Sequence, residues 1–180
     1  MTAAPDRLKL VESFLNSVDM DSGRDCLHSL AGFRDWLADH GQTEAAGSAT
    51  DADLDLARGV RDGLRDEIRR RQEGAPGGAT DLDRLVARLP LRVRFDDSGT
   101  RLVPAATGVA GFLGGIVAAV FLAAHDGTFQ RLKICREDSC RYVFYDRSKN
   151  CSRCWCSMDP CGNRNKTRAW RQRQRSRQSV

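Results

Sequence analysis

The stretch CREDSCRYVFYDRSKNCSRCWCSMDPCGNRNK, from Cys135 to Lys166, contains six of the chain's seven cysteines. Their spacing is Cys-x4-Cys-x10-Cys-x2-Cys-x-Cys-x4-Cys. The N-terminal sequence MTAAPDRLKLVESF lacks the basic and apolar regions of a secretory signal, so we expect a cytoplasmic protein. In a reducing compartment, clustered cysteines bind metal or undergo redox chemistry instead of forming a disulfide framework. The stretch therefore predicts a metal or redox site.

The residues around the cysteines indicate how such a site is built. YVFYD, residues 142–146, is a strand candidate, RSKN can form a turn, and RCWC, residues 153–156, can form a returning strand. After Cys161 the chain has no proline and only Gly162 to weaken a helix. The turn from Cys135 to Cys140 is a zinc knuckle. A knuckle, a hairpin and a helix whose first turn supplies a ligand make a treble-clef zinc module. So small a module has too little core to fold alone, so metal binding supplies much of its folding free energy.

This arrangement predicts one Zn²⁺ per chain, held by four thiolates in a closed tetrahedral site. The predicted ligands are Cys135, Cys140, Cys156 and Cys161. Cys151 and Cys154 also have good zinc spacing, so a ligand set that uses one of them stays open. A two-zinc cluster of all six cysteines has a different spacing and is disfavoured.

Cys151 and Cys154 have two further interpretations if they do not bind zinc. Their neighbours Arg147, Lys149 and Arg153 are cationic, and cations lower thiol pKa values and favour oxidation. The pair is therefore a redox candidate. The plainer interpretation, that both are inert loop cysteines, is favoured over a redox switch.

Several of these motifs carry a resemblance to a known family. Residues 129–170 resemble the CGNR-type zinc finger in their ligand spacing and in the motifs FYD, WCSM and CGNR, the last from Cys161 to Arg164. The resemblance implies zinc bound by the two Cys-x4-Cys pairs and DNA binding by the finger. Upstream, LVESFLNSVD and HDGTFQRLKIC resemble the helical domain fused in front of this finger in a group described as stress-induced bacterial transcription regulators. The chain departs from the finger pattern at Cys151 and Cys154, where polar or basic residues are expected.

Charge is distributed very unevenly along the chain. From Arg131 onward there are 14 Lys and Arg residues against 4 Asp and Glu, a formal charge of +10, and the preceding residues carry −5. An acidic body with a basic end is typical of a nucleic-acid-binding chain. Helical geometry after Cys161 places Arg164, Arg168, Arg171 and Arg175 on one face, flanked by Lys166. We predict that these five residues bind nucleic acid, with double-stranded DNA favoured over RNA.

The first 128 residues form a mainly helical body with one β-hairpin. Apolar residues recur at helical spacing around residues 8–18, 26–37, 51–71 and 82–89, and residues 41–50 are predicted to be a loop. In LRVRFDDSGTRLVP, residues 91–104, apolar residues alternate with arginines before a DDSG turn, which predicts a β-hairpin. We predict domains at 1–128, the body, and 129–180, the zinc module with its basic helix.

One apolar stretch raises the question of a membrane span. Residues 105–124 carry no charge and are about long enough to cross a bilayer, but they are rich in Ala and Gly and have no flanking basic cluster. We therefore predict a buried core helix and no membrane association.

These observations favour a DNA-binding transcriptional regulator containing zinc. The alternative is a zinc-stabilised RNA-binding or protein-interaction adaptor without sequence-specific DNA binding. The chain contains no G-x-S-x-G, no H-E-x-x-H and no phosphate-loop motif, so we do not expect an enzyme. The sequence leaves open whether the body binds a small-molecule effector and whether the chain forms a homodimer.

Overall fold

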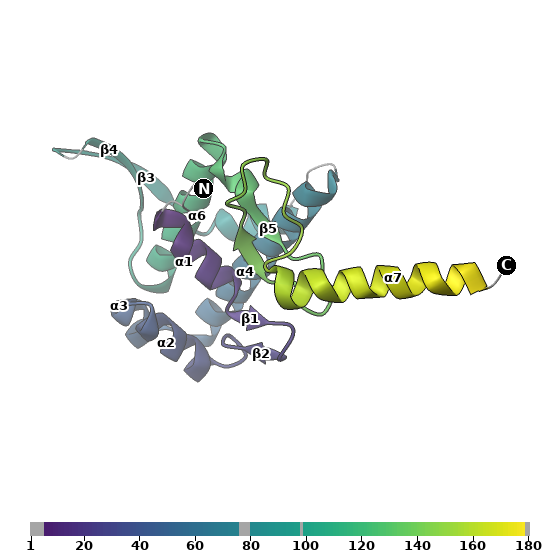
Figure 1. Cartoon of the computed structure of the whole chain (residues 1–180). Coiled ribbons are helices and arrows are strands. Elements are labelled where there is room, and N and C mark those ends of the chain that lie inside the picture. Colours follow the sequence, from purple (N-terminus) through teal and green to yellow (C-terminus); the bar gives the residue numbers. More distant parts are fainter. Residues whose placement is uncertain (1–5, 76–79, 98, 179–180) are drawn as a thin grey trace.

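The computed structural model describes residues 6–75, 80–97 and 99–178, without the side chains of Thr80, Ala169, Gln172, Arg173 and residues 175–178. The elements in chain order are α1 (Asp6–Leu15), β1 (Val18–Asp19), β2 (Arg24–Asp25), α2 (Leu30–Asp39), α3 (Thr43–Ser48), α4 (Asp51–Glu73), α5 (Thr80–Val86), β3 (Leu91–Asp96), β4 (Gly99–Pro104), α6 (Gly108–His125), η1 (Thr128–Arg131), β5 (Leu132–Ile134), β6 (Val143–Tyr145), η2 (Met158–Gly162) and α7 (Asn163–Gln178). Figure 1 shows α7 projecting from one side of the body and the β3–β4 hairpin from the other. The predicted fold class, mainly helical with a hairpin and a C-terminal cysteine cluster, is confirmed.

The long helix α4 organises the body. Thr50 and Asp53 form a capping box at its N-terminus, and Gly74, with a φ of 69°, ends it in the left-handed conformation. Its predicted inward residues, Leu56, Val60, Leu64 and Ile68, are all buried. Arg61 in the middle of α4 forms two hydrogen bonds to the carboxylate of Asp25, at 2.6 and 3.0 Å, which tie β2 to the helix.

Helix α6 passes the length and composition test for a membrane span, yet it packs in the protein interior. Seven of its residues are buried, and its partners are α1, α3, α4, β4 and η1. Phe112 of α6 meets Phe14 edge-on, with ring centroids 5.6 Å apart, in the centre of the core. These contacts agree with the prediction of a core helix.

The short sheet β5–β6 belongs to the same hydrophobic core as the helices. Leu132, Ile134, Val143 and Tyr145 are buried in the cluster that contains the core residues of α1, α2, α4 and α6. The core therefore crosses the predicted domain boundary at residue 128.

Two side-chain amides complete the outer edges of this sheet. Gln72 of α4 donates to the carbonyl of Ile134 at 3.1 Å and accepts from its N–H at 2.9 Å. Asn16, just after α1, makes the same two bonds to Val143, both at 2.8 Å. Each amide occupies the hydrogen-bonding positions that a neighbouring strand would use, so a two-stranded sheet leaves no unpaired backbone groups at these points.

Three sequence-based expectations about local structure are wrong. Residues 43–48 form the helix α3, because Ala45 packs into the core although the segment has a weak apolar pattern. The second helix begins at Leu30 and leaves Cys26 outside it, although Cys26 does pack against the core. RCWC does not form a returning strand: β6 pairs with β5, which precedes the knuckle, and this pairing is antiparallel.

Candidate metal centre and basic helix

Four cysteine sulfur atoms converge at the end of the β5–β6 sheet. The Sγ atoms of Cys135, Cys140, Cys156 and Cys161 all lie within 4.8 Å of one another. The Cys140–Cys156 and Cys156–Cys161 separations are 3.7 and 3.8 Å. A tetrahedron with Zn–S bonds of about 2.3 Å has sulfur–sulfur edges of about 3.8 Å. The donor set therefore fits one Zn²⁺, with the ligand set predicted from the sequence.

Three of the four ligands come from differently constrained segments. Cys135 follows β5, and its N–H donates to the carbonyl of Tyr142 at 2.9 Å across the knuckle. The N–H of Cys140 donates to the carbonyl of Glu137 at 2.9 Å and closes the knuckle turn. Cys161 lies in η2, directly before α7, so the metal site and the start of that helix are one structural unit.

The thiols need a cation to ionise together. Burial raises the pKa of Cys140 to about 11, and burial together with the neighbouring thiols raises the pKa of Cys161 still further. Burial also opposes ionisation of Cys156, but hydrogen bonds from the other three thiols outweigh it and lower its pKa. A divalent metal compensates the charge of four thiolates, which is the chemistry that Zn²⁺ would supply at this structural site.

A buried carboxylate, Asp146, organises the loop between the two ligand pairs. Its side chain is fully buried and accepts hydrogen bonds from Lys133 Nζ at 2.8 Å and from the N–H groups of Ser148 and Arg153, both at 2.9 Å. Burial opposes its ionisation, but these donors prevail and hold the pKa of Asp146 well below its usual range. Lys133 also donates to the carbonyls of Cys151 and Arg153, so the loop folds around one ion pair.

Cys151 and Cys154 lie on this loop and are not among the four clustered sulfur atoms. Cys151 Sγ lies 3.8 Å from the carbonyl of Gln130, and Cys154 Sγ lies 3.6 Å from the carbonyl of Ser152. Within the described part of the chain, the group of sulfur atoms suited to one metal is built from the outer pairs alone.

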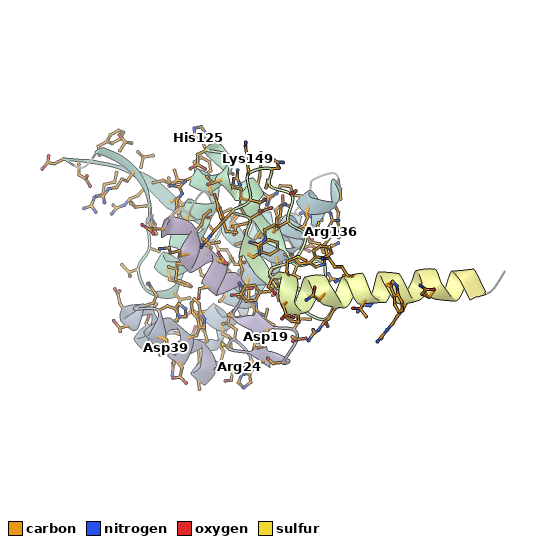
Figure 2. The ribbon with its side chains drawn as sticks, viewed as in Figure 1. Asp19, Arg24, Asp39, His125, Arg136 and Lys149 are labelled. Carbon is orange, nitrogen blue, oxygen red and sulfur yellow. The ribbon has the colours of Figure 1, made fainter. Side chains whose placement is uncertain are left out.

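Helix α7 is attached to the rest of the protein by two acidic residues. Glu137 in the knuckle is 1% exposed and accepts from Asn165 Nδ2 at 2.7 Å and from the Arg168 guanidinium at 3.2 Å. Arg164 pairs with Asp21 of the β1–β2 turn at 3.1 Å. Figure 2 labels Asp19 and Arg24, the strand residues on either side of this turn.

A groove of about 720 Å³ runs along one face of α7. It is lined by Asp159, Pro160, Asn163, Arg164, Thr167, Arg168 and Arg171. Three of the five predicted nucleic-acid-binding residues thus share one surface. Lys166 is exposed and does not line the groove, and the side chain of Arg175 lies outside the described residues. Trp170 is 56% exposed.

Comparison with known families agrees with this architecture. The CGNR zinc finger matches residues 131–174. The ABATE family, described as "Putative stress-induced transcription regulator", matches residues 8–127, about two thirds of the chain. The chain belongs to the ABATE family. No curated protein matches it.

In this ABATE protein, sequence reasoning identified the four clustered cysteines but missed the acids that hold α7 and the loop between the ligand pairs. Asp21 and Glu137 were not singled out, and Asp146 was noted only as the last residue of the FYD motif, although each is an acid in or against a basic segment. For Glu137 and Asp146, a position inside a basic module was the available signal, because an acid there tends to be paired. The partner of each acid depends on contacts between segments far apart in the sequence.

Proposed function

We propose that this zinc-binding ABATE protein regulates transcription by binding double-stranded DNA through α7. The observation that carries the proposal is the anchoring of the basic helix at its first turns. Cys161 in the metal site and buried Glu137 hold the start of α7, which then leaves the body. A helix of 16 residues is about 24 Å long, and the major groove of DNA, about 12 Å wide, admits a helix.

Arginine is suited to this role because its planar fork binds phosphates and guanine edges. Four thiolates on Zn²⁺ carry a formal charge of −2, which leaves about +8 on the residues from Arg131 onward. That charge supports nucleic-acid binding by release of counterions. A cytoplasmic location agrees with this function.

The arginines of α7 are proposed to have two roles. Arg164 and Arg168 are oriented by Asp21 and Glu137, yet their side chains remain 44% and 62% exposed. Oriented arginines can read base edges. Arg171 is exposed and has no ion-pair partner among the described residues, which suits a contact to phosphate. Arg175 and Lys166 are proposed to add phosphate contacts.

The test is DNA selection followed by binding measurements against salt concentration. The zinc-loaded full chain is used to select duplexes from a random library, and affinities are measured on a selected and a scrambled duplex. We expect Arg168→Ala to cost about 1–3 kcal/mol on the selected duplex and to relax its preference. We expect Arg171→Ala to weaken binding to both duplexes alike. The slope of log affinity against log salt concentration should fall by the contribution of about one phosphate contact.

Arg84→Ala is the matched control, because Arg84 is an exposed arginine on α5, remote from the zinc site in sequence, and it should leave binding unchanged. Equal, sequence-blind losses from Arg168→Ala and Arg171→Ala would reduce α7 to an electrostatic tail. Binding to single-stranded or duplex RNA in preference to DNA, or no effect of either variant, would favour the adaptor alternative.

A further inference from the structure

The β3–β4 hairpin, Leu91–Pro104, is an arm with two chemically different faces. The register pairs Val93 with Leu102 and Phe95 with Thr100, so the residues Leu91, Val93, Phe95, Leu102 and Pro104 share an apolar face. The opposite face carries Arg92, Arg94 and Arg101. Figure 1 shows the arm extending away from the helices.

The apolar face is covered only at the root of the arm. There Leu91 and Pro104 lie against Gly114 of α6, where a Cβ atom would come within 3.1 Å of Pro104. Farther out, Val93 is 55% exposed and Phe95 is 79% exposed. A lone two-stranded hairpin is marginally stable in water, and an exposed phenylalanine at its end adds no stability unless something covers it.

A groove of about 790 Å³ begins where the arm leaves the body. It runs between α1, α3 and α6, and its apolar lining includes Leu10, Ala45, Pro104, Phe112 and Ala119. Two acidic residues, Asp6 and Glu44, also line it. Arg7, the basic lining residue, is paired with Asp126, and Asp6 is paired with Lys9, so Glu44 is the lining charge without an ion-pair partner among the described residues.

We propose that this groove receives the β3–β4 arm of a second copy of the chain, so that two copies exchange arms about a twofold axis. Pro104 belongs both to the root of the arm and to the lining of the groove. An axis beside Pro104 therefore places each arm over the other copy's groove, which is the self-complementary arrangement that a twofold dimer requires. Because the two arms exchange reciprocally, every contact between arm and groove occurs twice in the dimer. Each Phe95 would bury on the order of 150 Å².

Charge favours a second copy as the occupant. The arm has three Arg and two Asp residues, a formal +1, whereas the other residues of 1–130 have 12 Lys and Arg and 18 Asp and Glu, a formal −6. Arg92 on the arm and Glu44 in the groove both lack an ion-pair partner among the described residues. DNA would neutralise the arginines of the arm but would leave the apolar face of Val93 and Phe95 without an apolar partner. The inference does not depend on DNA binding by α7.

Sedimentation equilibrium of the zinc-loaded full chain tests the proposal. We expect the wild-type chain to be dimeric and Phe95→Ser to raise the dimer dissociation constant at least tenfold. Phe121→Ser is the matched control, because Phe121 is a 58% exposed phenylalanine on α6 that does not line the groove. Glu44→Arg should weaken the dimer, whereas Asp35→Arg, a reversal at an exposed position outside the groove, should not. Circular dichroism and zinc content confirm that each variant folds.

Three results would overturn the proposal. A wild-type chain that stays monomeric at about 100 µM forms no dimer of useful affinity. Dissociation by Phe121→Ser but not by Phe95→Ser would place the dimer interface on α6 instead of the arm. A Phe95→Ser variant that keeps the wild-type mass but loses DNA affinity would make the arm a nucleic-acid contact.

Discussion

At the scale of single residues, a few buried charges and thiols hold the C-terminal module in shape. Glu137 joins the knuckle to α7 through Asn165 and Arg168, and Asp146 shapes the intervening loop. Both carboxylates are almost fully buried, which is tolerated because each accepts hydrogen bonds from several donors. The metal site and Glu137 fix where α7 begins, and Asp21 and Glu137 orient its first arginines, Arg164 and Arg168.

Cysteine substitutions should separate the four metal ligands from the other cysteines of the cluster. We expect Cys135→Ser and Cys161→Ser to release zinc and unfold the module, because three thiolates cannot complete the closed tetrahedral site. Cys151→Ser and Cys154→Ser should each retain one zinc per chain, because their sulfur atoms lie outside the cluster. Elemental analysis of the purified variants measures this. Zinc loss from Cys154→Ser with retention in Cys161→Ser would mean that a different ligand set is used.

At the scale of elements, the β5–β6 sheet is stabilised by side chains of two helical segments of the body. Asn16 and Gln72 pair with the backbone of Val143 and Ile134 on the two outer edges of the sheet. Arg65 and Arg71 of α4 add bonds to the carbonyls of Arg141 and Phe129. A two-stranded sheet of three residues per strand is too small to be stable alone, so these bonds from the helices are needed for its geometry.

Removing one amide should therefore cost more than a typical surface substitution. We expect Asn16→Ala to lower the free energy of unfolding by about 2–4 kcal/mol, because it leaves the N–H and carbonyl of Val143 unpaired. Asn150→Ala, at an exposed loop position, is the matched control and should change it by less than about 0.5 kcal/mol. Urea denaturation of both variants measures the difference. Equal, small changes in the free energy of unfolding of both variants would show that water pairs with the backbone of Val143 as well as the Asn16 amide does.

At the scale of the whole molecule, one hydrophobic core runs through both family regions. The ABATE match ends at residue 127 and the zinc-finger match begins at 131, but Leu132, Ile134, Val143 and Tyr145 lie in the core of the body. The arm and α7 leave this core on opposite sides. In an arm-exchanged dimer, both copies would keep α7 free for another partner.

A chain that ends at residue 128 should consequently fail to fold cooperatively. It loses five buried side chains of this core, those of Phe129, Leu132, Ile134, Val143 and Tyr145, worth about 1.5–3 kcal/mol each, from a total stability of about 5–15 kcal/mol. We expect a non-cooperative urea transition and binding of a hydrophobic dye. A chain that ends at Arg171 is the control, because it removes only projecting helix and should unfold like the full chain. Cooperative unfolding of the 128-residue chain at the full-length midpoint would instead support two independent domains.

Local patterns were sufficient to predict much of this protein. The two Cys-x4-Cys pairs and the family resemblance predicted the clustered ligands Cys135, Cys140, Cys156 and Cys161, because each short pair can supply two thiolates to one tetrahedral site. Helical periodicity predicted α4, the lack of helix breakers after Cys161 predicted α7, and alternation predicted the β3–β4 arm. These features depend on residues close together in the chain, so the sequence carries them directly.

Contacts between distant segments decided the rest. The partner of β6 is β5 and not RCWC, because the body's core and the amides of Asn16 and Gln72 hold the β5–β6 pair in place. Helix α3 forms because Ala45 has a core to pack against, not because its segment has a strong pattern. The pairing of Arg168 with Glu137 likewise appears only once knuckle and helix meet. Such contacts depend on how helices and strands pack in three dimensions, and no spacing along the chain encodes that packing.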